Sequence, residues 1–230
     1  MGRVVRAGGD LSRVGGDRFY VSRRRMVERL ARSGIRDARV LEALAAVPRH
    51  ALVADALGHR AYAEAPLPIG AGQTISAPGT VAAMSAALAL TGKERVLEIG
   101  TGSAYQAAVL ARLAARVISV ERVPALASRA RRALDRLGVS NVVVHLGDGT
   151  RGWPAEAPYD AILVTAGGPA PPDPLLAQLA PGGRLIGPFG PRGAQRLLRV
   201  RRDARGVLRA PEVLGVAKFV DLVGDHGWGD

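Results

Sequence analysis

The chain of 230 residues contains no cysteine. This absence excludes a disulfide framework, a thiolate nucleophile and any metal site with cysteine ligands. Histidine is also scarce, and His50, His59, His145 and His226 never pair at the spacing of metal ligands. We therefore expect these histidines to be structural or surface residues, and we expect no metal.

Long hydrophobic runs are missing as well. No apolar stretch is long enough to span a bilayer, and the N-terminus lacks the continuous apolar segment of a signal peptide. We therefore expect a cytoplasmic protein without a membrane partner, and a monomer. Hydrophobic residues make up 48% of the chain and charged residues 23%, as in ordinary globular proteins, and the length suits a single α/β domain.

Lysine is nearly absent, because Lys93 and Lys218 are the only two in a chain with a formal net charge of +12. Residues 1–40 hold eleven arginines and four acids, which is +7 of that total. This excess indicates either an arm that binds nucleic acid or an acidic partner, or a solvated basic tail in an arginine-rich proteome. No aromatic residues are interleaved with the arginines for base stacking, which favours the tail and argues against nucleic acid as a partner.

The chain divides into a short arm and one domain. Residues 1–16 carry five glycines without periodicity and are expected to form a flexible basic arm. Residues 17–230 are expected to form the domain. Its first part, 17–90, has helical patterns over 20–32, from an Asp37 cap to Pro48, and over 78–90, with an irregular Pro- and Gly-rich stretch at 49–76. The other two parts are an α/β core at 91–190 and C-terminal strands at 191–230.

Apolar runs alternate with amphipathic segments throughout the core. This alternation is typical of a parallel sheet covered on both faces, so the fold class is α/β, doubly wound and Rossmann-like, with helices added at the N-terminus. The expected strands are 94–100, 116–121, 141–147, 159–166 and 183–190, and the expected helices are 103–114, 124–138 and 173–180.

Acidic residues stand at three successive strand ends of this core. In an open α/β sheet, ligands bind at the carboxyl ends of the strands. Glu98 precedes a Gly-Thr-Gly turn, Glu121 ends the second strand and suits the two hydroxyls of a ribose, and Asp148 follows the third strand, where it suits the amine of an adenine. These three positions predict a nucleoside site.

A dinucleotide is the alternative ligand for such a site. The dinucleotide fingerprint needs a third glycine, but Tyr105 stands at that position. Glu98, just before the glycines, disfavours a pyrophosphate and suits a cation. S-adenosylmethionine carries a sulfonium and an ammonium group and no phosphate, so the pattern favours this methyl donor, with S-adenosylhomocysteine as the product.

The motifs at these positions resemble one family in order and spacing. VLEIGTGSAYQAAVLA with ISVER, then GDGTRGWPAEAPYDAILVTA and QLAPGGRLIGPFG, are similar to the protein-L-isoaspartate O-methyltransferases. The segment VPRHALVADALGHRAYAEAPLPIGAGQTISAP resembles the stretch that builds the substrate site of that family, and KFVDLVGDHGW resembles its C-terminal strand. The likeness covers roughly residues 22–228.

The resemblance implies a seven-stranded, mostly parallel methyltransferase sheet. It also implies the family's reaction, in which the free α-carboxylate of an isoaspartyl residue in a damaged protein is methylated and repair proceeds through a succinimide. Ser76 stands at the family's active-site serine. The implied substrate-binding residues are Thr74, Ile75, Ser76, Leu222 and Val223. The expected cofactor-binding residues are Glu98, Gly100, Thr101, Gly102, Ser103, Tyr105, Gln106, Glu121, Arg122, Gly147, Asp148, Gly149 and Thr165.

The chemistry suits these residues independently of the resemblance. A carboxylate has a reference pKa near 4 and is already an ionised nucleophile at neutral pH, so no general base is needed. Catalysis is then mostly orientation, and the Ser76 hydroxyl is suited to hold the acceptor. The alternative role for Ser76 is the N-cap of the helix that starts at Pro78.

Four positions depart from the family pattern. Ala104 replaces a glycine beside the donor motif, Gly79 replaces an aromatic or histidine and could leave one wall of the donor pocket missing, Gly168 lies in an altered loop, and Asp221 replaces a proline. These departures bear on substrate range.

Three other functions stay open from the sequence. An RNA methyltransferase is disfavoured, because the loop after the fourth core strand, Thr165 to Pro169, lacks the acidic or amide and aromatic residues of base-methylating enzymes. A carboxylate methyltransferase for one dedicated peptide of a natural product is a closer alternative. A non-catalytic nucleic-acid-binding protein using the basic arm is the third.

Overall fold

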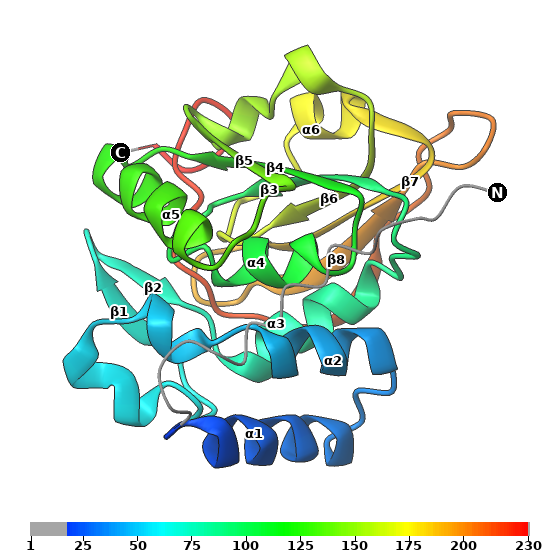
Figure 1. The fold of residues 1–230 in the computed structure, drawn as a ribbon. Helices are drawn as coiled ribbons and strands as arrows, with labels where there is room; N and C mark the ends of the chain where they lie inside the picture. Colours follow the sequence, from blue (N-terminus) through cyan, green and yellow to red (C-terminus); the bar gives the residue numbers. More distant parts are fainter. Residues whose placement is uncertain (1–17, 230) are drawn as a thin grey trace, which may run out of the picture.

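A seven-stranded sheet forms the centre of the protein in the computed structural model, which describes residues 18–229 (Figure 1). The predicted arm, 1–16, lies outside the described residues. The strand order is β5-β4-β3-β6-β7-β8-β9, which confirms the predicted fold class. The strands are β3 (Arg95–Ile99), β4 (Arg116–Glu121), β5 (Val142–Leu146), β6 (Tyr159–Val164), β7 (Leu179–Phe189), β8 (Arg196–Arg201) and β9 (Glu212–Val216).

The first five strands of this sheet, β3 to β7, pair in parallel, and β8 and β9 extend it with antiparallel pairs. Successive residues of β3 point to opposite faces, so Val96 belongs to one core layer and Leu97 to the other, both fully buried. Burial on both faces explains why these strands are continuous apolar runs in the sequence.

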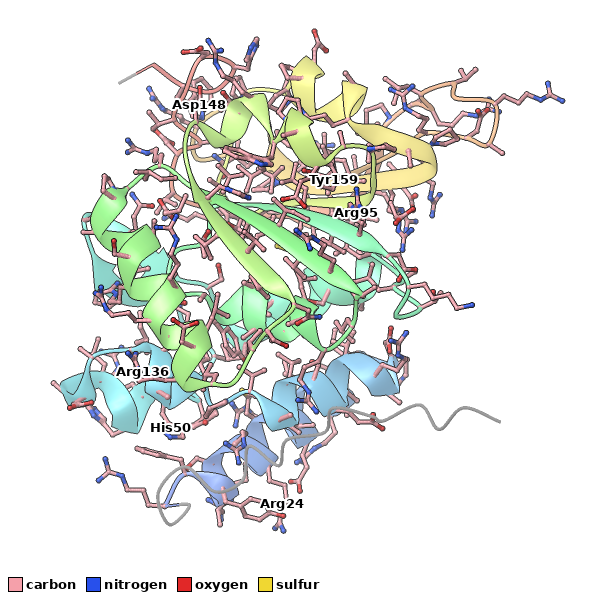
Figure 2. All side chains as sticks on the ribbon, turned by 45° about the horizontal axis from the view of Figure 1, so that its top comes forward. Arg24, His50, Arg95, Arg136, Asp148 and Tyr159 are labelled. Carbon is pink, nitrogen blue, oxygen red and sulfur yellow. The ribbon has the colours of Figure 1, made fainter. Side chains whose placement is uncertain are left out.

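Helices cover the two faces of the sheet unequally. The face with α3 (Pro78–Ala87), α4 (Tyr105–Ala111) and α5 (Pro124–Arg136) carries the larger apolar layer, and the short α6 (Asp173–Ala177) lies on the other face (Figure 1). Figure 2 shows side chains filling both layers, with Asp148 and His50 at opposite sides of the sheet.

Two further helices pack outside α3. Helix α1 (Tyr20–Arg32) buries Met26 and Leu30, and α2 (Ala38–Ala46) starts at Asp37, whose side chain accepts the amides of Arg39 and Val40. The bounds of α1 and the cap of α2 confirm the sequence prediction, because local periodicity and capping determine both.

The expectation of an irregular stretch at 49–76 was wrong in part. The segment contains two 3-10 turns and a two-stranded hairpin, β1 (Leu67–Gly70) and β2 (Gln73–Ile75). Gly70, Ala71 and Gly72 all have positive φ and form the turn, while Pro68 occupies an exposed position of this isolated pair, where its missing N–H is tolerated. The hairpin lies over the glycine turn after β3, since an ideal Cβ on Gly102 would lie 3.4 Å from Ile69 Cδ1.

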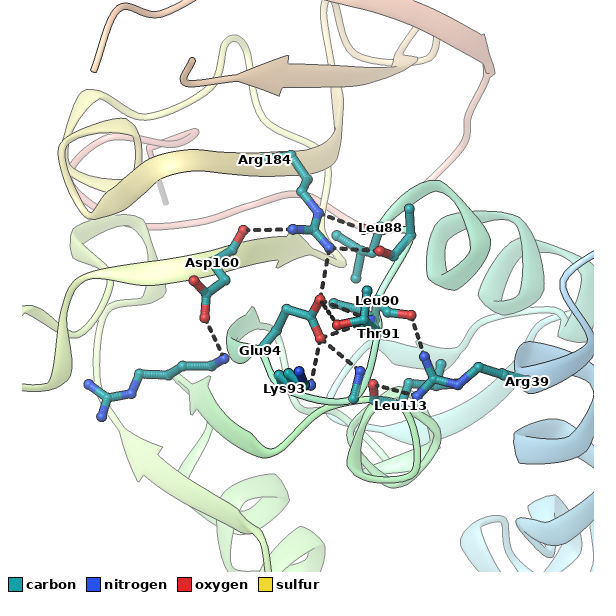
Figure 3. A network of polar contacts seen from close by, with 12 residues as sticks. Arg39, Leu88, Leu90, Thr91, Lys93, Glu94, Leu113, Asp160 and Arg184 are labelled. Carbon is teal, nitrogen blue, oxygen red and sulfur yellow. Dashed lines mark hydrogen bonds and ion pairs between the residues drawn. The ribbon is translucent and has the colours of Figure 1, made fainter. Parts of the chain in front are cut away.

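A polar network fastens the N-terminal helices to the sheet (Figure 3). The Glu94 carboxylate accepts the amides of Thr91, Gly92 and Lys93 at 2.9–3.0 Å and the Thr91 hydroxyl at 2.9 Å. Arg184 of β7 lies 3.7 Å from Glu94 and donates to the carbonyls of Leu88 and Ala89. Burial alone would raise the pKa of Glu94, but the hydrogen bonds from Thr91 and Gly92 outweigh it and lower the pKa to about 2.

Glu94→Gln is expected to lower the free energy of unfolding by about 2 kcal/mol at pH 7, because the amide cannot accept all these bonds. A pKa below the unfolded value stabilises the fold above that value, and this contribution is lost as pH falls from about 4.5 towards 2. The deficit should therefore shrink by more than half at pH 3, as measured by urea unfolding at both pH values. Glu42→Gln, an exposed change on α2, is the control, and an equal deficit at both pH values would contradict this role.

Neither membrane nor metal features are found within residues 18–229. No helix in that range is long and apolar enough to cross a bilayer. The same residues contain no group of three metal-ligating side chains.

Candidate active site

Three openings meet at the carboxyl edge of the parallel strands. The strand-end pocket spans about 560 Å³, the helix pocket about 390 Å³ and the outer cleft about 1110 Å³, and each volume includes space that is open to solvent. Thr74 of β2 and Thr165, just after β6, line all three. These two threonines therefore mark the point where the openings join.

The strand-end pocket is built mainly from the turns that follow β3, β4, β5 and β6. Its walls come from these turns, from β2 and from the C-terminal segment 220–223. The lining residues are Gln73, Thr74, Ile99, Gly100, Gly102, Val120, Glu121, Arg122, Gly149, Thr165, Ala166, Val220, Asp221, Leu222 and Val223.

The helix pocket lies between the glycine turn and the start of α3. Four predicted cofactor-binding residues that do not line the strand-end pocket line this one: Thr101, Ser103, Tyr105 and Gln106. The two pockets share Gly100 and Gly102, so they adjoin along the turn.

Glycine is required at the turn after β3. Gly100 has a φ of 95°, and an ideal Cβ there would lie 2.5 Å from the Thr165 hydroxyl oxygen. That hydroxyl donates to the carbonyls of Ile99 and Gly100 at 2.9 and 2.7 Å, which fixes the strand ends of β3 and β6 side by side. The absence of a side chain keeps the backbone open to a ligand.

Glu121 is held in place by two backbone amides. Its carboxylate accepts the amide of Gly102 at 2.8 Å and that of Val123 at 2.9 Å, and it lines the strand-end pocket. A carboxylate has about four acceptor positions, so two amides leave capacity for a pair of ligand hydroxyls. The side chain thus joins the turns after β3 and β4 around the pocket.

Glu98 lies behind the pockets and lines neither of them. It is fully buried on β3; one oxygen accepts the Ser119 hydroxyl, and the other has no hydrogen-bond partner among residues 18–229. Ser119 in turn contacts the hydroxyl of Thr101, 2.6 Å away, which lines the helix pocket. Burial, opposed by Ser119 and reinforced by the nearby Glu121, raises the pKa of Glu98 to about 8.

Glu98→Gln is expected to stabilise the ligand-free protein at high pH. Because the pKa of Glu98 is higher in the folded than in the unfolded state, its side chain does not reduce the free energy of unfolding below about pH 4.5. As pH rises from there through about 8, the free energy of unfolding falls progressively. Glutamine keeps an acceptor for Ser119 without the charge. The variant should therefore gain about 2 kcal/mol over the parent at pH 9, or about 4–8 °C in Tm, and little at pH 5, as measured by calorimetry. A variant less stable than the parent at pH 9 would show that Glu98 is ionised and satisfied.

Asp148 holds the C-terminal segment. Its carboxylate accepts the amide and hydroxyl of Thr150 at 2.8 and 2.7 Å and the amide of Asp225 at 2.9 Å. Burial opposes these bonds, yet they hold the pKa of Asp148 below its usual value. Asp148 and Gly147 do not line the strand-end pocket, whereas the next residue, Gly149, does.

Ser76 lines both the helix pocket and the outer cleft. It is not the cap of α3, because the N-cap is Ala77 and has no side-chain cap bond. Glu64 instead accepts the amide of Gly79 at 2.8 Å. The structure thus places Ser76 at the passage between a pocket and the cleft and leaves its hydroxyl free of the capping role.

A buried arginine fixes the backbone at Ser76. The guanidinium of Arg49, which is fully buried, donates to the Ser76 carbonyl at 2.9 Å and to the carbonyls of Ala61 and Ala65. Its carbon lies 5.5 Å from the ring centre of Tyr105. Burial lowers the pKa of Arg49, partly offset by Tyr105 and Glu64.

The C-terminal segment is placed by the loop after β6. Gly167 donates to the Val220 carbonyl at 2.7 Å and accepts the Leu222 amide at 2.8 Å. An ideal Cβ on Gly168 would lie 3.1 Å from Leu222 Cδ2, so two glycines here let the segment lie close. Leu222 and Val223, predicted as substrate-binding residues, line the strand-end pocket rather than the outer cleft.

Two of the departures have a visible structural role. Asp221 pairs with Arg192 at 2.8 Å while lining the strand-end pocket. Gly79 lies in a separate surface hollow beside Arg29 and Ser33, where Glu64 fills the space a side chain would take. Gly79 lines neither the strand-end pocket nor the helix pocket. Ala104, with φ of 69°, starts α4 and lines neither pocket.

The residues present fit S-adenosylmethionine. Glu121 has spare acceptor capacity for a ribose, and Ile99, Val120 and Leu222 supply apolar walls for an adenine. No phosphate-binding third glycine is present, and buried acids at this turn disfavour a pyrophosphate.

Comparisons with known proteins agree with this geometry. The family model described as Protein-L-isoaspartate(D-aspartate) O-methyltransferase (PCMT) matches residues 21–227. The chain is 56% identical to Protein-L-isoaspartate O-methyltransferase 1 of Syntrophobacter fumaroxidans over 91% of this chain and 98% of that one. It is 53% identical to the Protein-L-isoaspartate O-methyltransferase of Geobacter metallireducens over 92% and 98%.

Solved structures show the same relationship. A protein-L-isoaspartate O-methyltransferase structure with 29% identity has a TM-score of 0.79 and covers 89% of this chain and 67% of its own. A second structure assigned to this class, from Plasmodium falciparum in complex with S-adenosyl-L-homocysteine, has 25% identity, a TM-score of 0.76 and coverage of 87% and 98%. The chain therefore belongs to the protein-L-isoaspartate(D-aspartate) O-methyltransferase family.

Proposed function

We propose that methyl transfer takes place where the outer cleft opens into the two inner pockets, at Thr74, Ser76 and Thr165. The transfer is from S-adenosylmethionine to the free α-carboxylate of an isoaspartyl residue, the reaction of the family. The observation that supports this placement is that Thr74 and Thr165 line all three openings. A donor along the glycine turn and a peptide in the cleft would meet there.

The proposed donor site consists of the strand-end and helix pockets. Glu121 would accept the ribose hydroxyls, the glycine turn would lie against the methionine portion, and Thr101 and Gln106 would supply polar contacts in the helix pocket. When bound, S-adenosylmethionine supplies an electrophilic methyl group on a positively charged sulfur.

The protein's own contribution is positioning. The acceptor carboxylate is ionised at neutral pH, so its oxygen forms the new bond to carbon while the electron pair of the broken carbon–sulfur bond stays on sulfur. No proton has to be removed. Ser76 would donate a hydrogen bond to the second carboxylate oxygen, and the apolar side chains of Val81 and Val220 would limit water at the junction. Fixing the orientation of two reactants supplies most of the rate gain in such a step.

The product is a methyl ester whose alcohol is a good leaving group. Attack by the neighbouring backbone amide nitrogen on that ester closes a succinimide and releases methanol, without help from the enzyme. Hydrolysis of the succinimide then returns part of the material to ordinary aspartate. The protein thus initiates repair.

The test is methyl transfer from labelled S-adenosylmethionine to an isoaspartyl peptide, with the matched aspartyl peptide as control. We expect base-labile label on the isoaspartyl peptide alone. Donor binding without transfer to that peptide, or equal labelling of the aspartyl peptide, would overturn the assignment.

A further inference from the structure

The outer cleft has two walls of different origin. One wall is formed by Pro66 and by the segment from Thr74 to Thr80, and the other by residues 218–220 of the C-terminal segment, with Thr165 at the junction. A peptide in the cleft would lie between these walls. Val220 also lines the strand-end pocket, whereas Phe219 and Lys218 line only the cleft, so the C-terminal wall leads away from the junction towards Lys218.

Lys218 is the one charged side chain among the described residues that line the outer cleft. It is exposed, and no carboxylate within residues 18–229 forms an ion pair with it. The neighbouring arginines differ in this respect: Arg192 pairs with Asp221, and Arg199 with Glu212. Among the described residues, the ammonium group of Lys218 therefore has no ion-pair partner at the cleft.

The backbone on both sides of Lys218 is fixed. Ala217 donates its amide to the Gln195 carbonyl at 3.0 Å, and Phe219 donates its amide to the Gln195 side chain at 3.2 Å. Gln195 is buried, with 2% of its surface exposed. These two hydrogen bonds to Gln195 hold the backbone of Lys218 at the cleft. The position of its ammonium group can therefore vary only by rotation within the lysine side chain.

We propose that Lys218 is a specificity-determining residue, which pairs with a carboxylate of the peptide within two residues of the isoaspartyl residue. The inference rests on the proposed function. Lys218 lies two residues from Val220, which lines both the cleft and the strand-end pocket. Two residues of extended chain span about 7 Å. This length is about the spacing, in a bound peptide, between the isoaspartyl residue and a side chain one or two positions away. Pairing with the reacting carboxylate itself would reduce its nucleophilicity, so the partner is a second acid.

The test uses the full-length protein and a set of isoaspartyl peptides with glutamate, glutamine or lysine at each of the two positions before and after the isoaspartyl residue. For at least one position we expect the glutamate peptide to exceed the glutamine peptide about 3- to 5-fold in kcat/KM, as for an exposed ion pair. The difference should lie in KM, with kcat changed less than about 2-fold, and should fade at 0.5 M salt as charge screening predicts.

Lys218→Glu should invert the order, so that the lysine peptide becomes the better substrate. Lys93→Glu is the matched control, because it makes the same change of net charge at the far end of β3 and should keep the wild-type order. The same peptide order in Lys218→Glu as in the wild type, or inversion by Lys93→Glu as well, would overturn the proposal. A wild-type protein that methylates none of the peptides would instead overturn the proposed function, so the two failures are distinguishable.

Discussion

Glu121→Ala is expected to weaken the binding of S-adenosylmethionine about 100-fold. The carboxylate is held by the amides of Gly102 and Val123 and faces the strand-end pocket, so it is ready to accept ligand hydroxyls without reorganisation. Two charge-assisted hydrogen bonds of this kind together contribute about 2.7 kcal/mol, which corresponds to that factor.

Calorimetric titration with S-adenosylhomocysteine measures this effect directly. Glu121→Gln, which keeps one acceptor, should lose about 10-fold, and Glu42→Ala, an exposed change on α2, should bind normally. Circular dichroism would check that the sheet is intact. Binding by Glu121→Ala within 3-fold of the parent would show that the ribose lies elsewhere.

Ser76→Ala is expected to lower kcat/KM for an isoaspartyl peptide about 30-fold, since one hydrogen bond to a charged acceptor contributes about 2 kcal/mol. Donor affinity should change less than 2-fold. The Tm should also stay unchanged, because Ala77 rather than Ser76 is the N-cap of α3 and Glu64 bonds the first turn.

The matched control is Thr80→Ala, which removes another hydroxyl from the same cleft and should retain nearly full activity. A contradicting result would be a Tm lowered by several degrees in Ser76→Ala, with kcat/KM reduced only in proportion to the folded fraction. That result would indicate that Ser76 has a structural role and does not bind the acceptor carboxylate.

The sequence was most informative where structure is local. Asp37 before an amphipathic run predicts the start of α2, and periodic apolar residues predict α1 over the residues that form it. Gly100, Glu121 and Gly149, which lie at or just after strand ends, also predict the edge at which the pockets lie, because parallel strands bring their carboxyl ends together.

The hairpin β1–β2 shows why the N-terminal segment was harder. Pro68, Gly70 and Gly72 are usually signs of irregular structure, yet here they occupy an exposed position and a tight turn of two short strands. The alternation of buried Leu67 and Ile69 with exposed neighbours is the signal that could have revealed it. The end of α6 shows a smaller error of the same kind, since β7 already begins at Leu179, before Pro181 and the glycines that follow.

The C-terminal wall could not be predicted from local patterns. Its position depends on the pairing of Gly167 with Val220 and Leu222, more than 50 residues apart in the chain, and on the two hydrogen bonds to Gln195. These contacts place Leu222 and Val223 at the strand-end pocket and Lys218 at the cleft. The scarcity of lysine was visible in the sequence, but its location beside a binding surface was not.

A crystal structure of the protein with S-adenosylhomocysteine and an isoaspartyl peptide tests the central claim most directly. The account predicts the ribose against Glu121, the sulfur at the junction of Thr74 and Thr165, and the isoaspartyl carboxylate beside the Ser76 hydroxyl with the peptide between the walls of the outer cleft. A nucleoside bound away from Glu121, or an acceptor carboxylate that reaches the sulfur from outside this junction, would contradict it.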